Sequence, residues 1–225
     1  MLRSFFQLFF PRICSVCHQT LVAGENAVCF KCLFSLPKTN LHLRADNDVE
    51  KRFWGKTPVA AATAFFRFEK GGAVQKLLHE LKYKDNQDVG REMGKFLAAD
   101  LTASPRFQAV DYIVPVPLHE KKLKKRGYNQ SRCIAEGMSE IMKIPMNTDN
   151  LYRAVENPTQ TRKSVFERWE NVKDIFQLEN KEIFADKHIL LVDDVLTTGS
   201  TIEACAHAVL TAENAKVSVV ALAVA

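Results

Sequence analysis

The chain has 225 residues, 47% hydrophobic and 25% charged, with a formal net charge of +5. This composition is that of an ordinary globular protein and argues against intrinsic disorder, and no apolar run approaches the roughly 20 residues that a membrane span needs. The length fits one α/β domain plus a small module, and a charge this low makes local clusters of cations more informative than the total.

The first ten residues form an apolar stretch that only superficially resembles a signal peptide. Gln7 interrupts it, and Pro11-Arg12 stand where a small-residue cleavage site would be. We expect this stretch to pack on the body of the protein, with contact to a membrane surface or a partner as the alternative. Because no convincing export signal is found, we expect a cytoplasmic protein.

Four cysteines follow in two Cys-x-x-Cys pairs, Cys14 with Cys17 and Cys29 with Cys32, separated by eleven residues. Two such knuckles complete a tetrahedral sulfur site for Zn²⁺. Two disulfides are the alternative, but they require an oxidising compartment. With sulfur at all four positions we predict a structural Zn²⁺ site, whose metal supplies much of the folding free energy of a zinc module spanning residues 1–40.

The rest of the chain is predicted to contain a linker and one α/β domain. Residues 41–56 are polar and lack clear periodicity, which favours a linker, and the main domain is assigned to residues 57–225. The apolar pattern there predicts strands at 58–68, 111–117, 189–192 and 217–224, and helices at 74–81, 93–101, 134–141 and 202–209. This alternation indicates a parallel sheet with helices on both faces, in which ligands bind at the carboxyl ends of the strands.

Cations are concentrated after the strand at 111–117. Six lysines and arginines surround the sequence Gly127-Tyr128-Asn129-Gln130, namely Lys121, Lys122, Lys124, Lys125, Arg126 and Arg132. The functional interpretation is an anion site for diphosphate or a nucleic-acid backbone, with Tyr128 stacking on a base. The alternative is a solvated helix face.

A polar, proline-containing segment follows, running from Arg153 through residues 157–163 to Arg168. Its composition does not suit a core element, so we predict a mobile loop over the site. The loop residues with a predicted role in the site are Arg153, Gln160, Thr161 and Arg168. Trp169, next to them, is interpreted as an anchor of the loop.

Residues 188–201 carry the strongest functional signal. Four apolar residues predict a buried strand, Asp193 and Asp194 stand at its end, and a small, hydroxyl-rich loop leads into a helix. The free N–H groups of such a loop and the helix dipole bind a phosphate, while two carboxylates suit vicinal hydroxyls. The pattern therefore predicts a sugar-phosphate pocket. The alternative is a solvated Asp pair before an ordinary capped helix.

This stretch resembles the phosphoribosyl-diphosphate (PRPP) signature of type I phosphoribosyltransferases. The resemblance implies that Asp193 and Asp194 bind the ribose 2- and 3-hydroxyls of PRPP, together with Mg²⁺. It also implies that the 5-phosphate is wrapped by the residues of one loop, Thr197, Thr198, Gly199, Ser200 and Thr201.

Taken in chain order, the motifs resemble the ComF family of competence-associated phosphoribosyltransferase-like proteins. The two cysteine pairs are followed by a helix ending in Lys82-Tyr83 and by the segment from Val114 to Ser131. A block containing Gln160-Thr161 and Arg168, and then the loop motif ending at Thr201, complete the resemblance. It covers nearly the whole chain.

The family implies a type I phosphoribosyltransferase fold, PRPP with Mg²⁺, and handling of single-stranded DNA during natural transformation. We expect single-stranded DNA and other DNA-uptake proteins as partners. The residues assigned to diphosphate or nucleic acid are Lys121, Lys124, Lys125, Arg126, Tyr128, Asn129 and Gln130. Three functions stay open: a phosphoribosyltransferase, a non-catalytic PRPP or nucleotide sensor, and a DNA-handling factor. Purine-salvage relatives carry a carboxylate where this chain has Thr197, which weakens a hypoxanthine-guanine assignment.

Overall fold

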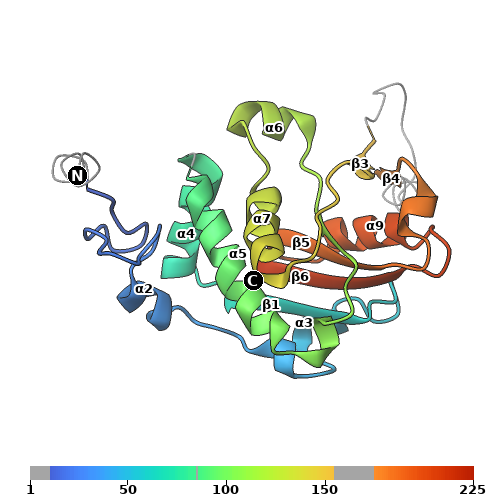
Figure 1. Ribbon diagram of the computed structural model, residues 1–225, viewed down its shortest axis with the longest axis horizontal. Helices are drawn as coiled ribbons and strands as arrows, with labels where there is room; N and C mark the ends of the chain where they lie inside the picture. Colours follow the sequence, from blue (N-terminus) through green and yellow to red (C-terminus); the bar gives the residue numbers. More distant parts are fainter. Residues whose placement is uncertain (1–10, 85, 155–174) are drawn as a thin grey trace.

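The computed structural model describes residues 11–84, 86–154 and 175–225 (Figure 1). Its centre is a parallel sheet with the strand order β1-β6-β5-β2. The strands of this sheet are β1 (Ala61–Arg67), β2 (Tyr112–Pro115), β5 (His188–Leu196) and β6 (Lys216–Val224). The predicted α/β class with a parallel sheet is confirmed.

Strand β5 is longer than the apolar run that predicted it. Its pairing with β6 continues to Leu196, which lies opposite Val224, whereas its pairing with β2 ends at Val192. Asp193 and Asp194 therefore lie within β5 but beyond the end of β2. The early end of β2 leaves one side of this acid pair free of a neighbouring strand.

Helices cover both faces of the sheet, as predicted. Leu190 and Val192 of β5 belong to the core shared with α4 (Ala73–Tyr83), α5 (Gln87–Thr102) and α7 (Gln130–Met142). Ile189 and Leu191 belong to the opposite core, shared with α9 (Ser200–Val209). A strand with both faces buried is apolar throughout, which explains the continuous run Ile189–Val192.

Helices α5 and α7 pack closely because glycines lie at their contact. A Cβ atom at Gly94 would overlap the carbonyl group of Ile134, and one at Gly137 would overlap the carbonyl group of Arg91. The contact fixes α7 against the sheet, and the first turn of α7 contains Ser131, which reaches the acid pair.

Residues 41–56, predicted as a linker, are packed against β1. They contain η1 (Leu41–Leu43) and α3 (Asp48–Lys51), and Val49 and Phe53 are each only 1% exposed. Asn47 accepts hydrogen bonds from the N–H groups of Val49 and Glu50, and its amide donates to the carbonyl of Ala62. Part of this packing depends on the buried polar residue Asn47, and burial of a polar residue leaves no apolar pattern in the sequence.

The cysteine-containing segment, with helix α2 (Phe30–Ser35), lies beside α4 (Figure 1). Leu33 and Leu36 belong to the same hydrophobic core as Val74 and Leu77 of α4. Lys38 forms an ion pair of 3.0 Å with Asp100 of α5. This segment is therefore docked on the main body rather than separated from it.

The remaining elements are short. They are η2 (Pro105–Phe107), α6 (Glu120–Arg126), η3 (Lys181–Phe184), and an antiparallel pair formed by β3 (Leu151–Arg153) and β4 (Phe176–Leu178). Helix α6 stands away from the sheet in Figure 1. None of the helices in the described ranges combines the length and apolar character that crossing a membrane requires. The apolar stretch 1–10 lies outside those ranges.

Candidate functional site

The acid pair is held by hydrogen bonds and one ion pair. Asp193 Oδ1 accepts from the hydroxyl of Ser131 (2.9 Å) and from the backbone N–H of Asp194 (2.8 Å). Asp194 Oδ2 lies 3.0 Å from Lys82 Nζ. Burial, and then the charge of Asp194, raise the pKa of Asp193 above its usual range, while the two hydrogen bonds and the charge of Lys82 oppose this rise.

The predicted phosphate loop connects β5 to α9. Helix α9 begins at Ser200, and its N-cap Gly199 has φ +89°, a left-handed conformation that favours glycine. Gly199 has no side chain to cap the helix, so the approach to the helix N-terminus stays open. A small hollow of about 30 Å³ is formed by Asp193 and residues 195–202. The loop residues therefore lie together with Asp193 around one concave point.

Arg52 and Phe53, from the segment predicted as a linker, support this loop. The Arg52 guanidinium donates to the carbonyl of Thr197, and also to the carbonyl of Ala225 at 2.6 Å. The Phe53 ring lies beneath Gly199, where a Cβ atom would stand 3.6 Å from Phe53 Cε1. Sequence reasoning missed both residues. The available signal was the aromatic pair Phe53-Trp54 inside a polar segment.

Residues 121–132, the basic segment, contain both exposed cations and residues that anchor the segment to the protein. Lys121, Lys124 and Lys125 are exposed on α6, a helix that buries none of its residues. The His119 side chain caps this helix by accepting from the N–H of Lys121 at 3.1 Å. Arg126 donates to Gln130 Oε1 at 2.6 Å. The lysines are thus free to meet an anion in solvent, whereas Arg126 already has a protein contact.

Tyr128, Asn129 and Gln130 hold the turn between α6 and α7. Tyr128 is 9% exposed and its hydroxyl donates to the carbonyl of Leu81. The Asn129 side chain donates to the carbonyl of Val116 at 2.9 Å and accepts from the N–H of Ser131 at 3.0 Å. Gln130 is 1% exposed. Burial of Tyr128 suits packing and not stacking on a base, so this part of the sequence interpretation is not retained.

A cavity of about 990 Å³ lies between α6, α7 and β3. Its lining includes Pro117, Lys121, Tyr128, Arg132, Glu136 and Arg153. The Arg153 guanidinium lies over the ring of Phe176, 5.4 Å from its centroid. Of the predicted mobile loop, Arg153 is thus placed at the cavity, whereas Gln160, Thr161, Arg168 and the neighbouring Trp169 lie outside the described residues.

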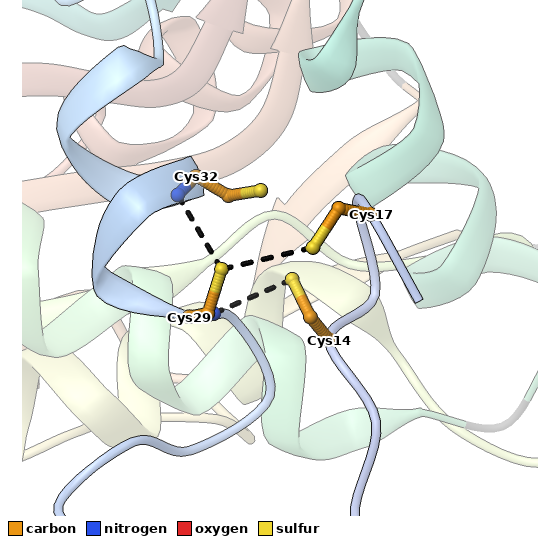
Figure 2. Close-up of side chains that lie close together, drawn as sticks. All are labelled: Cys14, Cys17, Cys29 and Cys32. Atoms are coloured by element: carbon orange, nitrogen blue, oxygen red, sulfur yellow. Dashed lines mark hydrogen bonds between the residues drawn. The ribbon is translucent and has the colours of Figure 1, made fainter. Parts of the chain in front are cut away.

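The four cysteines of the N-terminal pairs form one cluster (Figure 2). All four Sγ atoms lie within 4.8 Å of one another, and those of Cys17 and Cys29 are 3.7 Å apart. Zn–S bonds of about 2.3 Å in a tetrahedron place sulfurs about 3.8 Å apart, so the cluster fits a metal such as zinc.

Backbone N–H groups surround the sulfur of Cys14. Val16 and Cys29 donate to it at 3.4 and 3.3 Å. Burial works to raise the pKa of this thiol, but hydrogen bonds from the backbone of Cys17, Cys29 and Val16 outweigh it and lower the pKa to about 7. The thiolate, the form that binds metal, is therefore more populated at Cys14 than at an ordinary cysteine.

Part of the chain is similar to known phosphoribosyl transferase domains. A family model described as a phosphoribosyl transferase domain matches residues 129–225, which include Ser131, the acid pair and the phosphate loop. The chain is 28% identical over 202 residues to DNA utilization protein YhgH of Escherichia coli K12, covering 88% of this chain and 84% of that protein. It is 31% identical over 131 residues to competence protein F of Haemophilus influenzae, covering 56% and 57%.

One solved structure resembles part of the chain. The glutamine phosphoribosylpyrophosphate amidotransferase from B. subtilis is 18% identical, with a TM-score of 0.46, and the match covers 65% of this chain and 30% of that one.

Replacing Arg52 by Ala should loosen the phosphate loop, because both hydrogen bonds to the carbonyls of Thr197 and Ala225 are lost. We expect faster amide hydrogen exchange in residues 197–201 and a free energy of unfolding lower by about 1–3 kcal/mol. Lys51→Ala, which removes a neighbouring exposed cation, is the matched control. Unchanged exchange in Arg52→Ala would show that Arg52 does not support the loop.

Purified protein should contain about one equivalent of zinc after dialysis, because four sulfurs fit one tetrahedral ion. Cys14→Ser combined with Cys29→Ser should remove the metal and lower the melting temperature. Cys133→Ser combined with Cys205→Ser changes two cysteines outside the cluster and should retain the metal. Metal-free protein with two disulfides among the four cysteines would contradict the prediction.

Proposed function

Since this chain belongs to the ComF family and carries a phosphoribosyl transferase domain, we propose that it binds PRPP with Mg²⁺ and acts in handling single-stranded DNA. The observation that carries the proposal is the position of Asp193 and Asp194 beside the loop 197–201. In this assignment the carboxylates accept hydrogen bonds from the ribose 2- and 3-hydroxyls. The loop N–H groups and the N-terminus of α9 receive the 5-phosphate.

Mg²⁺, when bound with PRPP, would neutralise the diphosphate and help to orient it against the ribose hydroxyls. The acid pair is an oxygen donor set that suits this ion. The exposed lysines Lys121, Lys124 and Lys125 are the cations assigned to the diphosphate. In a transfer reaction they would stabilise the charge of the leaving diphosphate, and positioning by the phosphate loop would supply the rest.

The cavity of about 990 Å³ between α6, α7 and β3 is favourable to a transferase, because a transferase needs space for an acceptor. Its volume is in the range of small-molecule sites. A PRPP sensor is the second candidate, and it would bind PRPP without breaking the bond to diphosphate. Diphosphate release from PRPP, screened across bases, amines and DNA ends, distinguishes the two. Thr197 argues against hypoxanthine and guanine as acceptors.

The DNA-handling part of the proposal is supported by the exposed cations of α6 and by the names of the relatives, which refer to DNA utilization and competence. Within the described part of the chain, the lysines of α6 form no ion pair, so they can meet a phosphate backbone without breaking one. Other DNA-uptake proteins and a cytoplasmic location belong to the same proposal.

Asp193→Asn combined with Asp194→Asn should abolish Mg²⁺-dependent PRPP binding in calorimetric titrations. The double variant should fold, because burial already disfavours the charged form of Asp193. Asp149→Asn, at an exposed carboxylate, should bind PRPP normally. PRPP binding by the double variant at wild-type affinity would refute the assignment.

Lys121→Ala, Lys124→Ala and Lys125→Ala together should weaken single-stranded DNA binding and PRPP binding. The slope of log affinity against log salt should fall by about 2 for DNA, since each lost phosphate contact removes about 0.7. The matched control replaces Lys181, Lys187 and Lys216, which lie at the opposite end of the sheet. Fluorescence anisotropy in a salt series measures the slope.

Loss of DNA binding alone in the α6 variant would separate the two ligands and favour the DNA-handling function over the transferase. Normal binding of both ligands would assign the lysines of α6 to a solvated helix face.

A further inference from the structure

Three consecutive residues at the end of α4 contact three different parts of the proposed site. The carbonyl of Leu81 accepts from the Tyr128 hydroxyl. Lys82 Nζ lies 3.0 Å from Asp194 Oδ2. The ring of Tyr83 lies under the Arg126 guanidinium, whose carbon is 5.5 Å from the ring centroid. The last turn of α4 therefore joins the acid pair to the basic segment.

We propose that Lys82 is a positioning residue of the PRPP site, the cation that allows an anionic ligand to bind beside two carboxylates. The proposal rests on the assignment of PRPP to this site. Helix α4 lies outside residues 129–225, so the match to a phosphoribosyl transferase domain does not include this lysine. Among the described ion pairs, Lys82–Asp194 is the one that involves the acid pair.

The electrostatic argument starts from the charge that must gather at this point. Asp193 and Asp194 are adjacent, and PRPP adds a phosphate and a diphosphate to their surroundings. The side chains of Lys82 and Asp194 are only 23% and 15% exposed, so water and salt screen them incompletely. A cation held at this position offsets the repulsion between the carboxylates and the ligand.

The backbone of α4 is suited to hold a charge in place. Val74, Leu77, Leu78 and Leu81 are each at most 4% exposed, which fixes the helix on the core. The hydrogen bond from Tyr128 and the contact with Arg126 tie its last turn to the neighbouring segment. Lys82 therefore projects from a rigid element toward Asp194, and little ordering is needed when the ligand binds.

Two ligands of different charge distinguish an electrostatic role of Lys82 from a role in packing. PRPP keeps a larger negative charge than ribose 5-phosphate even with one Mg²⁺ bound. Lys82→Met should therefore weaken binding of Mg²⁺–PRPP by about tenfold and of ribose 5-phosphate by about threefold. Lys82→Arg, which keeps the charge, should restore most of the affinity for both ligands.

Lys84→Met is the matched control, since Lys84 is two residues away and pairs with Glu80 instead of the acid pair. Calorimetry with each ligand, and melting temperatures of all variants, give the comparison. Wild-type PRPP affinity in Lys82→Met, or an equal loss for both ligands that Lys82→Arg does not restore, would overturn the proposal. Failure of wild-type protein to bind either ligand would overturn the PRPP assignment itself, and with it the role of Lys82.

Discussion

The structure of the site depends on the repulsion between two adjacent carboxylates, Asp193 and Asp194. The fold partly removes both carboxylates from water, which strengthens this repulsion. Asp193 would be costly to ionise without compensation, because burial and the charge of Asp194 both raise its pKa. Three elements supply that compensation. Helix α7 brings the Ser131 hydroxyl, β5 itself brings the N–H of Asp194, and α4 brings the charge of Lys82. The close packing of α5 and α7 holds Ser131 beside Asp193, and the early end of β2 leaves one side of the acid pair free of a neighbouring strand.

The sequence predicted the elements whose signal is local. Apolar periodicity located the helices and strands of the sheet, and residue spacing located the cysteine cluster. Residue type and order predicted a phosphate-binding role for the loop between β5 and α9. The features that the sequence did not predict depend on contacts between residues far apart in the chain. Lys82 and Asp194 are far apart in the sequence and are brought together by the fold, so the sequence alone assigns no role to Lys82. The polar composition of residues 41–56 predicts a linker, but Asn47 and Glu50 are buried there through hydrogen bonds, and burial of polar residues leaves no apolar pattern.

Tyr128 illustrates a different limit of sequence reasoning. An aromatic residue between cations is typical of a surface that stacks on bases, yet here it anchors the turn between α6 and α7 through its hydroxyl. Tyr83, by contrast, is 63% exposed and has the Arg126 guanidinium over its ring. Composition correctly located the basic segment, but only packing decides which aromatic side chain faces solvent.

The cysteine cluster and the acid pair are linked through the same helix. Leu33 and Leu36 of the cysteine-containing segment share a hydrophobic core with Val74 and Leu77 of α4, and α4 ends in Lys82. A metal that stabilises this segment thereby stabilises one wall of that core. The phosphate loop is supported separately, by Arg52 and Phe53 from the other side of the sheet. Lys82 and the loop 197–201 thus rest on different parts of the chain. Lys82, which pairs with Asp194, depends on the cysteine-containing segment, whereas the loop depends on the segment that follows it.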